Sequence, residues 1–177
     1  MAELIKNDVV NAIMERRSVR GYTNEPLTED EVYTLVQCGL WAPSGRNNQT
    51  TMFSVVRDAE LLQKLHDEAM KDFPPAKNFY YEAPCVIFTY DKDGDKWSDI
   101  NASLAIENMH LAAHSMGLSS IILGCILDYM RSEKGDEWKK ILGIPEDYHF
   151  VLALGVGHAA RDAKTPPRDE KNIVYVK

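Results

Sequence analysis

The sequence predicts an α+β or α/β sandwich, in which helices pack on the faces of a sheet. Three observations support this. Apolar residues recur at helical spacing in several segments, short apolar runs typical of buried strands lie between them, and turn residues separate the two kinds of element. The 177 residues suit one compact domain, 1–177, with a sizeable core.

Two helices are expected first. The helix over residues 8–16 has Asn7 as its N-cap and one apolar face, made of Val9, Val10, Ile13 and Met14. The second helix begins at a capping box of Thr28 and Glu31. Leu27 and Val32 occupy the staple positions, and the buried stripe is Val32, Leu35, Val36 and Leu40. Pro43 and Gly45 end this helix in a polar loop.

A strand over residues 52–56 comes next, and Asp58 caps a third helix that carries Leu61, Leu62, Leu65 and Ala69. Residues 73–81 are aromatic and contain Pro74 and Pro75, which predicts a loop over the core. Residues 84–90 form a strand of the buried type, because Val86, Ile87 and Phe88 are consecutive.

The long helix over residues 97–116 has apolar side chains around a wide arc, so it must be buried on two sides, one of which could be another subunit. Gly117 suits its C-terminal end. A strand over 119–125, a helix near 132–142 and a buried strand over 150–156 follow. The tail from residue 160 ends in a strand-like run at 173–176, and a terminal strand far from its own core often pairs with a partner.

The composition of the chain makes some classes of function and location less expected than others. The net charge of −7 and pI of about 5.2 argue against general nucleic-acid binding. No signal-peptide pattern or membrane-length apolar run is present, so a cytoplasmic location is the default expectation. Cys38, Cys85 and Cys125 are widely spaced and are expected to be three buried thiols.

The strongest local signal is the basic segment (residues 16–20), which reads Arg-Arg-Ser-Val-Arg in an acidic chain. Guanidinium forks match phosphate oxygens, and a phosphate dianion needs about two of them. The alternative is that Arg16 and Arg17 only complement the negative end of the first helix.

A second signal is the amide loop (residues 42–49), which reads Ala-Pro-Ser-Gly-Arg-Asn-Asn-Gln. Its amides and hydroxyls suit the polar edge of a planar heterocycle, although an ordinary helix-stop loop has the same composition.

Two further patterns predict less. Gly155, Gly157 and Ala160 imitate a dinucleotide-binding fingerprint, but the helix, strand and acid that this motif requires do not follow. Glu107, His110 and His114 share one helix face, which leaves a metal-binding helical protein as an open alternative. The second Glu-x-x-His pair of a di-iron site is absent, and we expect a polar stripe at a helix or subunit contact and no metal.

Taken in order, these motifs resemble the nitroreductase family along nearly the whole chain. The match includes Pro167-Arg168 in the tail, Met116-Gly117-Leu118, and Leu142-Gly143-Ile144-Pro145. The resemblance implies an α+β three-layer sandwich with a mostly antiparallel central sheet. It also implies an intertwined homodimer with FMN at the subunit interface and the tail, about 160–177, extending onto the partner.

The resemblance further implies site residues in three groups. Arg16, Arg17, Ser18 and Arg20 hold the phosphate and the N1–O2 edge of FMN, and Arg168 joins the phosphate. Pro43, Ser44, Gly45, Asn47 and Gln49 approach FMN from the other subunit. The backbone contact near flavin N5 falls on Ile122, Leu123 and Gly124. No catalytic side chain is expected, because the flavin carries the chemistry.

The implied activity is ping-pong transfer of electrons from NADH or NADPH through FMN to small acceptors such as nitroaromatics or quinones. A flavin-dependent reductive dehalogenase and a flavin-binding protein without turnover are the alternatives. The chain departs from the family pattern at Thr50, where proline is usual, at Thr51, where an aromatic is missing, and at Pro166, where a lysine is frequent. Lys164 is the nearest lysine to that last position.

Overall fold

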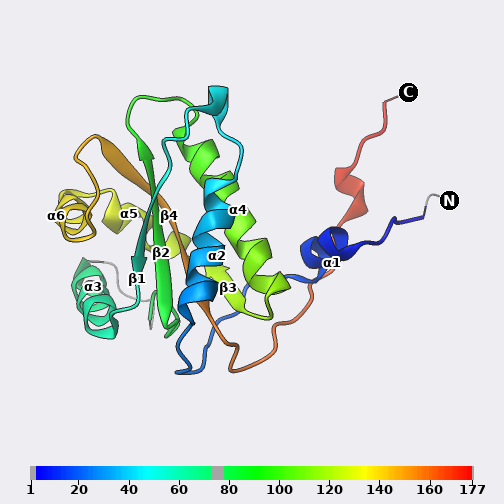
Figure 1. Ribbon diagram of the computed structural model, residues 1–177, viewed down its shortest axis with the longest axis horizontal. Helices are drawn as coiled ribbons and strands as arrows, with labels where there is room; N and C mark the ends of the chain where they lie inside the picture. Colours follow the sequence, from blue (N-terminus) through cyan, green and yellow to red (C-terminus); the bar gives the residue numbers. More distant parts are fainter. Residues whose placement is uncertain (1–2, 73–77, 177) are drawn as a thin grey trace.

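The computed structural model describes residues 3–72 and 78–176 and contains one four-stranded antiparallel sheet in the order β1-β2-β4-β3 (Figure 1). The strands are β1 (Met52–Val56), β2 (Cys85–Lys92), β3 (Ser119–Ile122) and β4 (Tyr148–Gly157). Strand β2 is buried along nearly its whole length, as the consecutive apolar residues predict. The sheet confirms the antiparallel arrangement and the α+β class.

Helices cover both faces of the sheet (Figure 1). On one face lie α2 (Glu29–Leu40) and α4 (Ser98–Ser115), and on the other lie α3 (Ala59–Asp72), α5 (Leu127–Met130) and α6 (Glu133–Ile141). Each face has its own apolar cluster. Ile87, Ile106 and Met109 belong to the first cluster, and Phe88 and Trp138 belong to the second. The three-layer arrangement is therefore present within a single chain.

The capping signals in the sequence are confirmed. Thr28 and Glu31 form the complete capping box of α2, and Asn7 accepts a hydrogen bond from Val10 N at the start of α1 (Asp8–Glu15). Asp58 accepts from two backbone N–H groups at the start of α3. Gly117 reverses the chain after α4 with φ of 78°, a conformation that glycine adopts without steric cost.

Other sequence predictions need correction. The strand predicted over 119–125 stops at Ile122, because the chain turns into a short 3-10 helix, Gly124–Ile126. Residues 173–176 form no strand and are 55–92% exposed, since no sheet edge within the described residues lies beside them. The three cysteines are not all buried: Cys85 is buried, Cys38 is partly exposed and Cys125 is exposed.

The expected loop over residues 73–81 lies partly outside the described residues, at 73–77. Its described end places Phe79 and Tyr80 in the core. In α2, Val32 and Leu35 are buried as predicted, but Leu40 is 54% exposed. Among the described residues, no helix is both long and apolar enough to cross a membrane.

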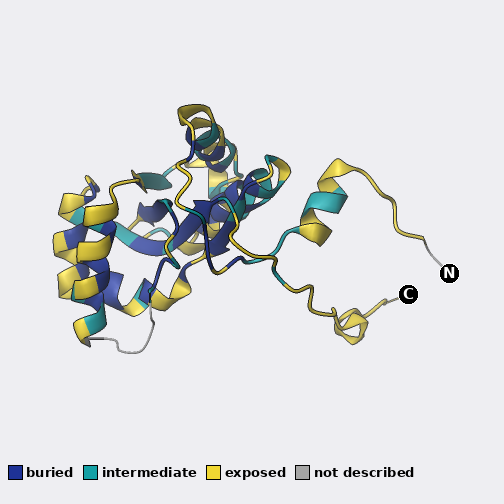
Figure 2. Cartoon of the chain, turned by 90° about the horizontal axis from the view of Figure 1, so that it is seen from below, coloured by how far each residue is buried: buried dark blue, intermediate teal, exposed yellow. Residues whose placement is uncertain are grey.

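Helix α1 and the tail stand away from the sheet, with both chain ends on the same side of the molecule (Figures 1 and 2). No residue of α1 is buried, and its predicted apolar face is largely open: Val9 is 68% exposed, and Ile13 and Met14 are each 52% exposed. The side chains of Ile100 and Leu104 on α4 are also exposed. Among the residues that the structure describes, the apolar face of α1 therefore has too few partners to cover it.

Candidate functional site

The basic segment leaves α1 and runs along the outer edge of β3. Ser18 forms a parallel bridge with Ser120, and Val19 N donates to Ser120 O over 3.1 Å. The hydroxyl of Tyr22 donates to the carbonyl of Val19 over 2.9 Å. The sheet edge thus fixes the backbone of the basic segment at Ser18 and Val19.

The tail crosses the basic segment and encloses a cavity of about 530 Å³ with it. Six cationic side chains and one carboxylate line the cavity: Arg16, Arg17, Arg20, Arg161, Lys164, Arg168 and Asp162. Ser18 also contributes to the lining. In a chain of net charge −7, this excess of five positive charges gives the cavity the electrostatics that an anionic ligand requires. The structure therefore brings Arg16, Arg17, Ser18 and Arg20 to the same cavity as Arg168 from the distant tail.

The two adjacent arginines of the basic segment differ in their hydrogen bonds. Arg17 donates from Nη1 to the carbonyls of Met14 and Arg16, each over 2.6 Å, so it completes the C-terminal end of α1. Arg16 Nη1 donates to His110 Nε2 over 2.7 Å. Arg16 Nε is buried without a hydrogen-bond partner among the described residues, 3.4 Å from a carboxylate oxygen of Glu107. Of the pair, Arg17 fits the helix-end alternative, whereas Arg16 keeps unused donor capacity beside the cavity.

Burial, together with the charges of Arg16 and His114, lowers the pKa of His110 to about 3. The imidazole is therefore neutral at physiological pH. Both of its ring nitrogens are engaged, one by Arg16 and the other by the hydroxyl of Ser120. No group of three or more potential metal ligands converges among the described residues, so the metal alternative based on His110 and His114 gains no support.

The amide loop lies at the N-terminal end of α4 and has a strained backbone. Arg46, Asn47 and Gln49 have φ values of 57°, 57° and 52°. The backbone N–H of Gly45 donates to Asn101 Oδ1 over 2.8 Å, and the N–H of Gln49 donates to Ser44 Oγ over 3.0 Å. A Cβ on residue 45 would lie 2.5 Å from Trp97 Cγ, so this position requires glycine.

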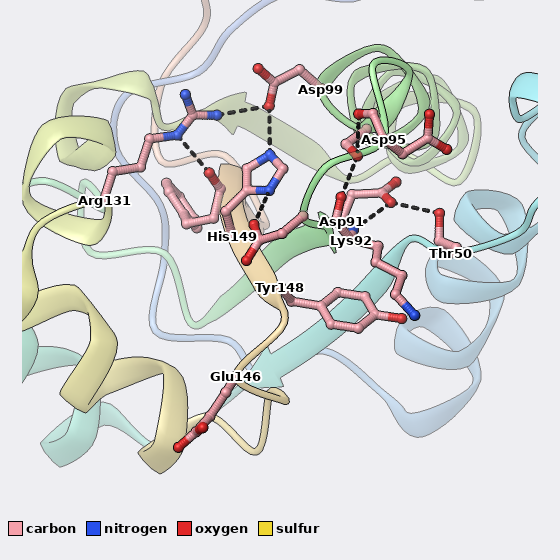
Figure 3. Close-up of polar contacts among 12 residues, drawn as sticks. Thr50, Asp91, Lys92, Asp95, Asp99, Arg131, Glu146, Tyr148 and His149 are labelled. Atoms are coloured by element: carbon pink, nitrogen blue, oxygen red, sulfur yellow. Dashed lines mark hydrogen bonds and ion pairs between the residues drawn. The ribbon is translucent and has the colours of Figure 1, made fainter.

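Asp91, at the end of β2, anchors the strand that follows the amide loop. Its carboxylate is buried and accepts from the hydroxyl of Thr50 over 2.6 Å (Figure 3). It also accepts from the hydroxyl of Thr51 over 2.7 Å. Thr50 and Thr51, at which the sequence departs from the family pattern, are therefore both held by one buried carboxylate. Asp95 adds a second anchor by accepting from the Asn48 side chain over 2.9 Å.

A neighbouring network fixes the first turn of α4 (Figure 3). Asp99 lies 3.0 Å from His149 Nε2 and accepts from Arg131 over 2.8 Å. Burial raises the pKa of the Asp99 carboxyl, but the hydrogen bond from His149 and the charge of Arg131 outweigh burial and lower the pKa below its ordinary value. The end of α4 that carries Asn101 is thus tied to β4 and to Arg131, the residue that follows α5.

The third predicted group lies where β3 ends. Leu123 is buried and its N–H donates to Ala153 O over 2.8 Å, so this N–H is not available to a ligand. Ile122 faces Leu154 in a pair that is not hydrogen-bonded, and its N–H therefore points outward, toward the edge occupied by the basic segment. Gly124 is exposed beside it.

Within one chain, the amide loop and the basic segment belong to separate cavities. A cavity of about 230 Å³ is lined by Pro43, Ser44 and Gln49 of the amide loop together with Asn101. It shares no lining residue with the cavity between the basic segment and the tail, called here the basic cavity. Gly45 and Asn47 lie on the same loop, where Asn47 Oδ1 accepts from the Gln49 side chain. The chain alone does not unite the two halves of the predicted site.

Comparison with known proteins identifies the chain. The model of the family described as "Nitroreductase family" matches residues 13–158, most of the chain and nearly all of the sheet and its helices. The chain belongs to the nitroreductase family. This family assignment agrees with the resemblance of the motifs.

Similarities to known proteins and solved structures support the family assignment. A protein of Archaeoglobus fulgidus is 28% identical, over 94% of this chain and 89% of its own. A Bacillus subtilis protein named FMN reductase (NADPH) is 27% identical, over 96% of this chain and 73% of its own. An FMN-bound nitroreductase structure from Desulfitobacterium hafniense has a TM-score of 0.86 and 26% identity, covering 98% of this chain and 100% of that chain. A Bacteroides fragilis nitroreductase structure has a TM-score of 0.91 at 24% identity, covering 97% and 100%, and supports the fold.

The structure adds residues that the sequence did not single out for the site. Arg161 joins the basic cavity because its guanidinium lies over Gly21, where a Cβ would be 2.6 Å away. Asn101 and Asp95 hold the amide loop, and Asp91 holds the two threonines that follow it. The helical spacing of His110 placed it on a polar stripe, but contact with Arg16 depends on how α4 packs, which spacing does not reveal.

Proposed function

We propose that this nitroreductase-family chain is an FMN-dependent oxidoreductase that takes electrons from NADH or NADPH and reduces small acceptors such as nitroaromatics or quinones. The observation that carries the proposal is the basic cavity, which unites predicted phosphate residues from both ends of an acidic chain. When bound, FMN supplies the redox chemistry by accepting a hydride at N5 and passing electrons to the acceptor.

The side chains of the cavity fit the phosphate end of FMN. Arg16, Lys164 and Arg168 offer charged donors, and the buried Nε of Arg16 has unused hydrogen-bonding capacity. Arg20 also lines the cavity and supplies a cation for the N1–O2 edge of the flavin. The backbone at the end of β3 lies beside the basic segment and suits flavin N5. The N–H of Ile122 points outward and is suited to donate a hydrogen bond, and Gly124 is exposed next to it.

We also propose a homodimer in which the amide loop of one subunit meets the basic segment of the other. An isolated helix of eight residues is unstable in water, and α1 has an exposed apolar face, so it needs a covering surface. Within one chain, the cavity at the amide loop and the cavity at the basic segment are separate. This separation supports the dimer, because the amide loop of one subunit would meet the basic segment of the other in a single shared site. The exposed tail, with Val174 and Tyr175 each 81% exposed, supports docking on the partner.

A visible absorption spectrum of the purified protein, repeated anaerobically with NADH and then with NADPH, tests the proposal. A flavin spectrum that bleaches with either nucleotide is the expected result. A colourless protein that does not take up added FMN would contradict the proposal. Consumption of NAD(P)H that depends on an added acceptor then separates an enzyme from a flavin-binding protein without turnover. Light scattering tests the dimer, since a monomer with bound flavin would contradict a shared site.

A further inference from the structure

A buried histidine connects α4 to the basic segment. His110 is 1% exposed, and its Nε2 accepts a hydrogen bond from Arg16 Nη1 over 2.7 Å. Its Nδ1 is hydrogen-bonded to the hydroxyl of Ser120. The turn at Gly117 reverses the chain between α4 and β3, which brings these two residues together although they are ten positions apart.

The direction of these bonds follows from the donors. A guanidinium can only donate, so His110 Nε2 must carry a lone pair. The proton of a neutral imidazole is then on Nδ1, which donates to Ser120 Oγ. The charges that face His110 are Arg16 from the basic segment and His114 from α4. His110 thus orients Arg16 through a neutral acceptor, whereas Glu107, 3.4 Å from Arg16 Nε, is a charged neighbour of the same guanidinium.

Ser120 extends the same connection to the backbone. Its hydroxyl contacts His110, while its carbonyl accepts the N–H of Val19. The two residues therefore fix the basic segment at two points, the guanidinium of Arg16 and the peptide of Val19. Glu107, also on α4, lies 3.4 Å from Arg16 Nε, but its side chain is 42% exposed, so solvent screens this ion pair more than it affects the buried bond to His110.

We infer that His110 and Ser120 are positioning residues that aim the Arg16 guanidinium at the phosphate group of the flavin nucleotide. This inference rests on the proposed function, because it assumes that the basic cavity holds FMN. Neither residue lines the cavity formed by the basic segment and the tail, so both act through Arg16 and Val19.

Binding of FMN and riboflavin to apoprotein, followed by quenching of flavin fluorescence, tests the inference, because riboflavin lacks the phosphate. His110→Leu should weaken FMN binding roughly tenfold to 100-fold and change riboflavin binding less than about twofold. His110→Gln, which can return an acceptor to Arg16, should restore most of the FMN affinity. Ser120→Ala, a smaller change, should weaken FMN binding several-fold in the same selective way.

His66→Leu is the matched control. His66 is also buried, but it packs against Phe79 and Tyr80 in the cluster on the other face of the sheet. It should leave the ratio of FMN to riboflavin affinity unchanged. Thermal unfolding of each variant shows whether the fold is retained.

Several results would overturn the inference. Unchanged FMN affinity in folded His110→Leu or Ser120→Ala would remove the positioning role, as would equal weakening of both flavins. A glutamine variant no better than the leucine variant would show that the acceptor is unimportant. In these cases wild-type protein still binds FMN and the proposed function stands. If wild-type apoprotein binds no FMN, the proposed function fails and the inference fails with it.

Discussion

Replacing His110 should change how the stability of this protein depends on pH. The imidazole is almost completely buried and neutral, and burial together with the Arg16 charge lowers its pKa to about 3 from an ordinary value of 6.5. The unfolded chain therefore binds a proton at acidic pH that the folded chain does not. The stabilising effect is fully present above about pH 6.5 and decreases as the pH falls toward about 3.

The two pKa values give the size of the effect. Lowering the pH from about 7.5 to about 4.5 should reduce the free energy of unfolding by about 2.6 kcal/mol through this histidine alone. Glutamine does not titrate, so the His110→Gln variant should lack this contribution. Carboxylates that titrate over the same interval affect both proteins alike and cancel in the comparison.

Urea unfolding at the two pH values, followed by the fluorescence of the buried Trp138, measures the difference. The stability of the variant relative to wild type should rise by about 2.6 kcal/mol at the lower pH. Parallel pH profiles for the two proteins would refute the reasoning. Such a result would mean that His110 is protonated in the folded state or that water reaches it.

Four other changes have defined outcomes. Arg16→Ala combined with Arg20→Ala should release FMN on purification, because both charges line the basic cavity; full flavin occupancy would contradict the assignment. Gly45→Ala should lower the unfolding temperature and the FMN affinity together, since its Cβ would lie 2.5 Å from Trp97 Cγ; a variant with both values unchanged would show that the amide loop yields freely. Ile13→Glu on the open face of α1 should shift the protein toward monomer by light scattering, whereas Glu15→Gln should not. Asp99→Asn should cost at most about 1 kcal/mol in urea unfolding, because the side chain of Asp99 is 61% exposed and its ion pairs are screened; a loss several times larger would mean that this network stabilises more than the first turn of α4.

The sequence by itself determined the local features of this protein. The capping box at Thr28 and Glu31, the cap at Asp58 and the turn at Gly117 depend on neighbouring residues, so short-range patterns reveal them. The consecutive apolar residues of β2 likewise predicted a strand buried on both faces. The cluster of arginines at residues 16–20 of an acidic chain also indicated an anion site, although the sequence left the end of the first helix as an alternative partner for Arg16 and Arg17.

Only the tertiary structure decided which distant groups meet. Arg16 contacts His110 across 94 positions of sequence, and Arg161 reaches the cavity by lying over Gly21. The apolar side chains of α1 and of residues 173–176 are exposed in the single chain. A helical or strand pattern indicates that one side must be covered, but it does not show which surface covers it. The end of β3 at Ile122 depends on backbone geometry that an apolar run does not encode.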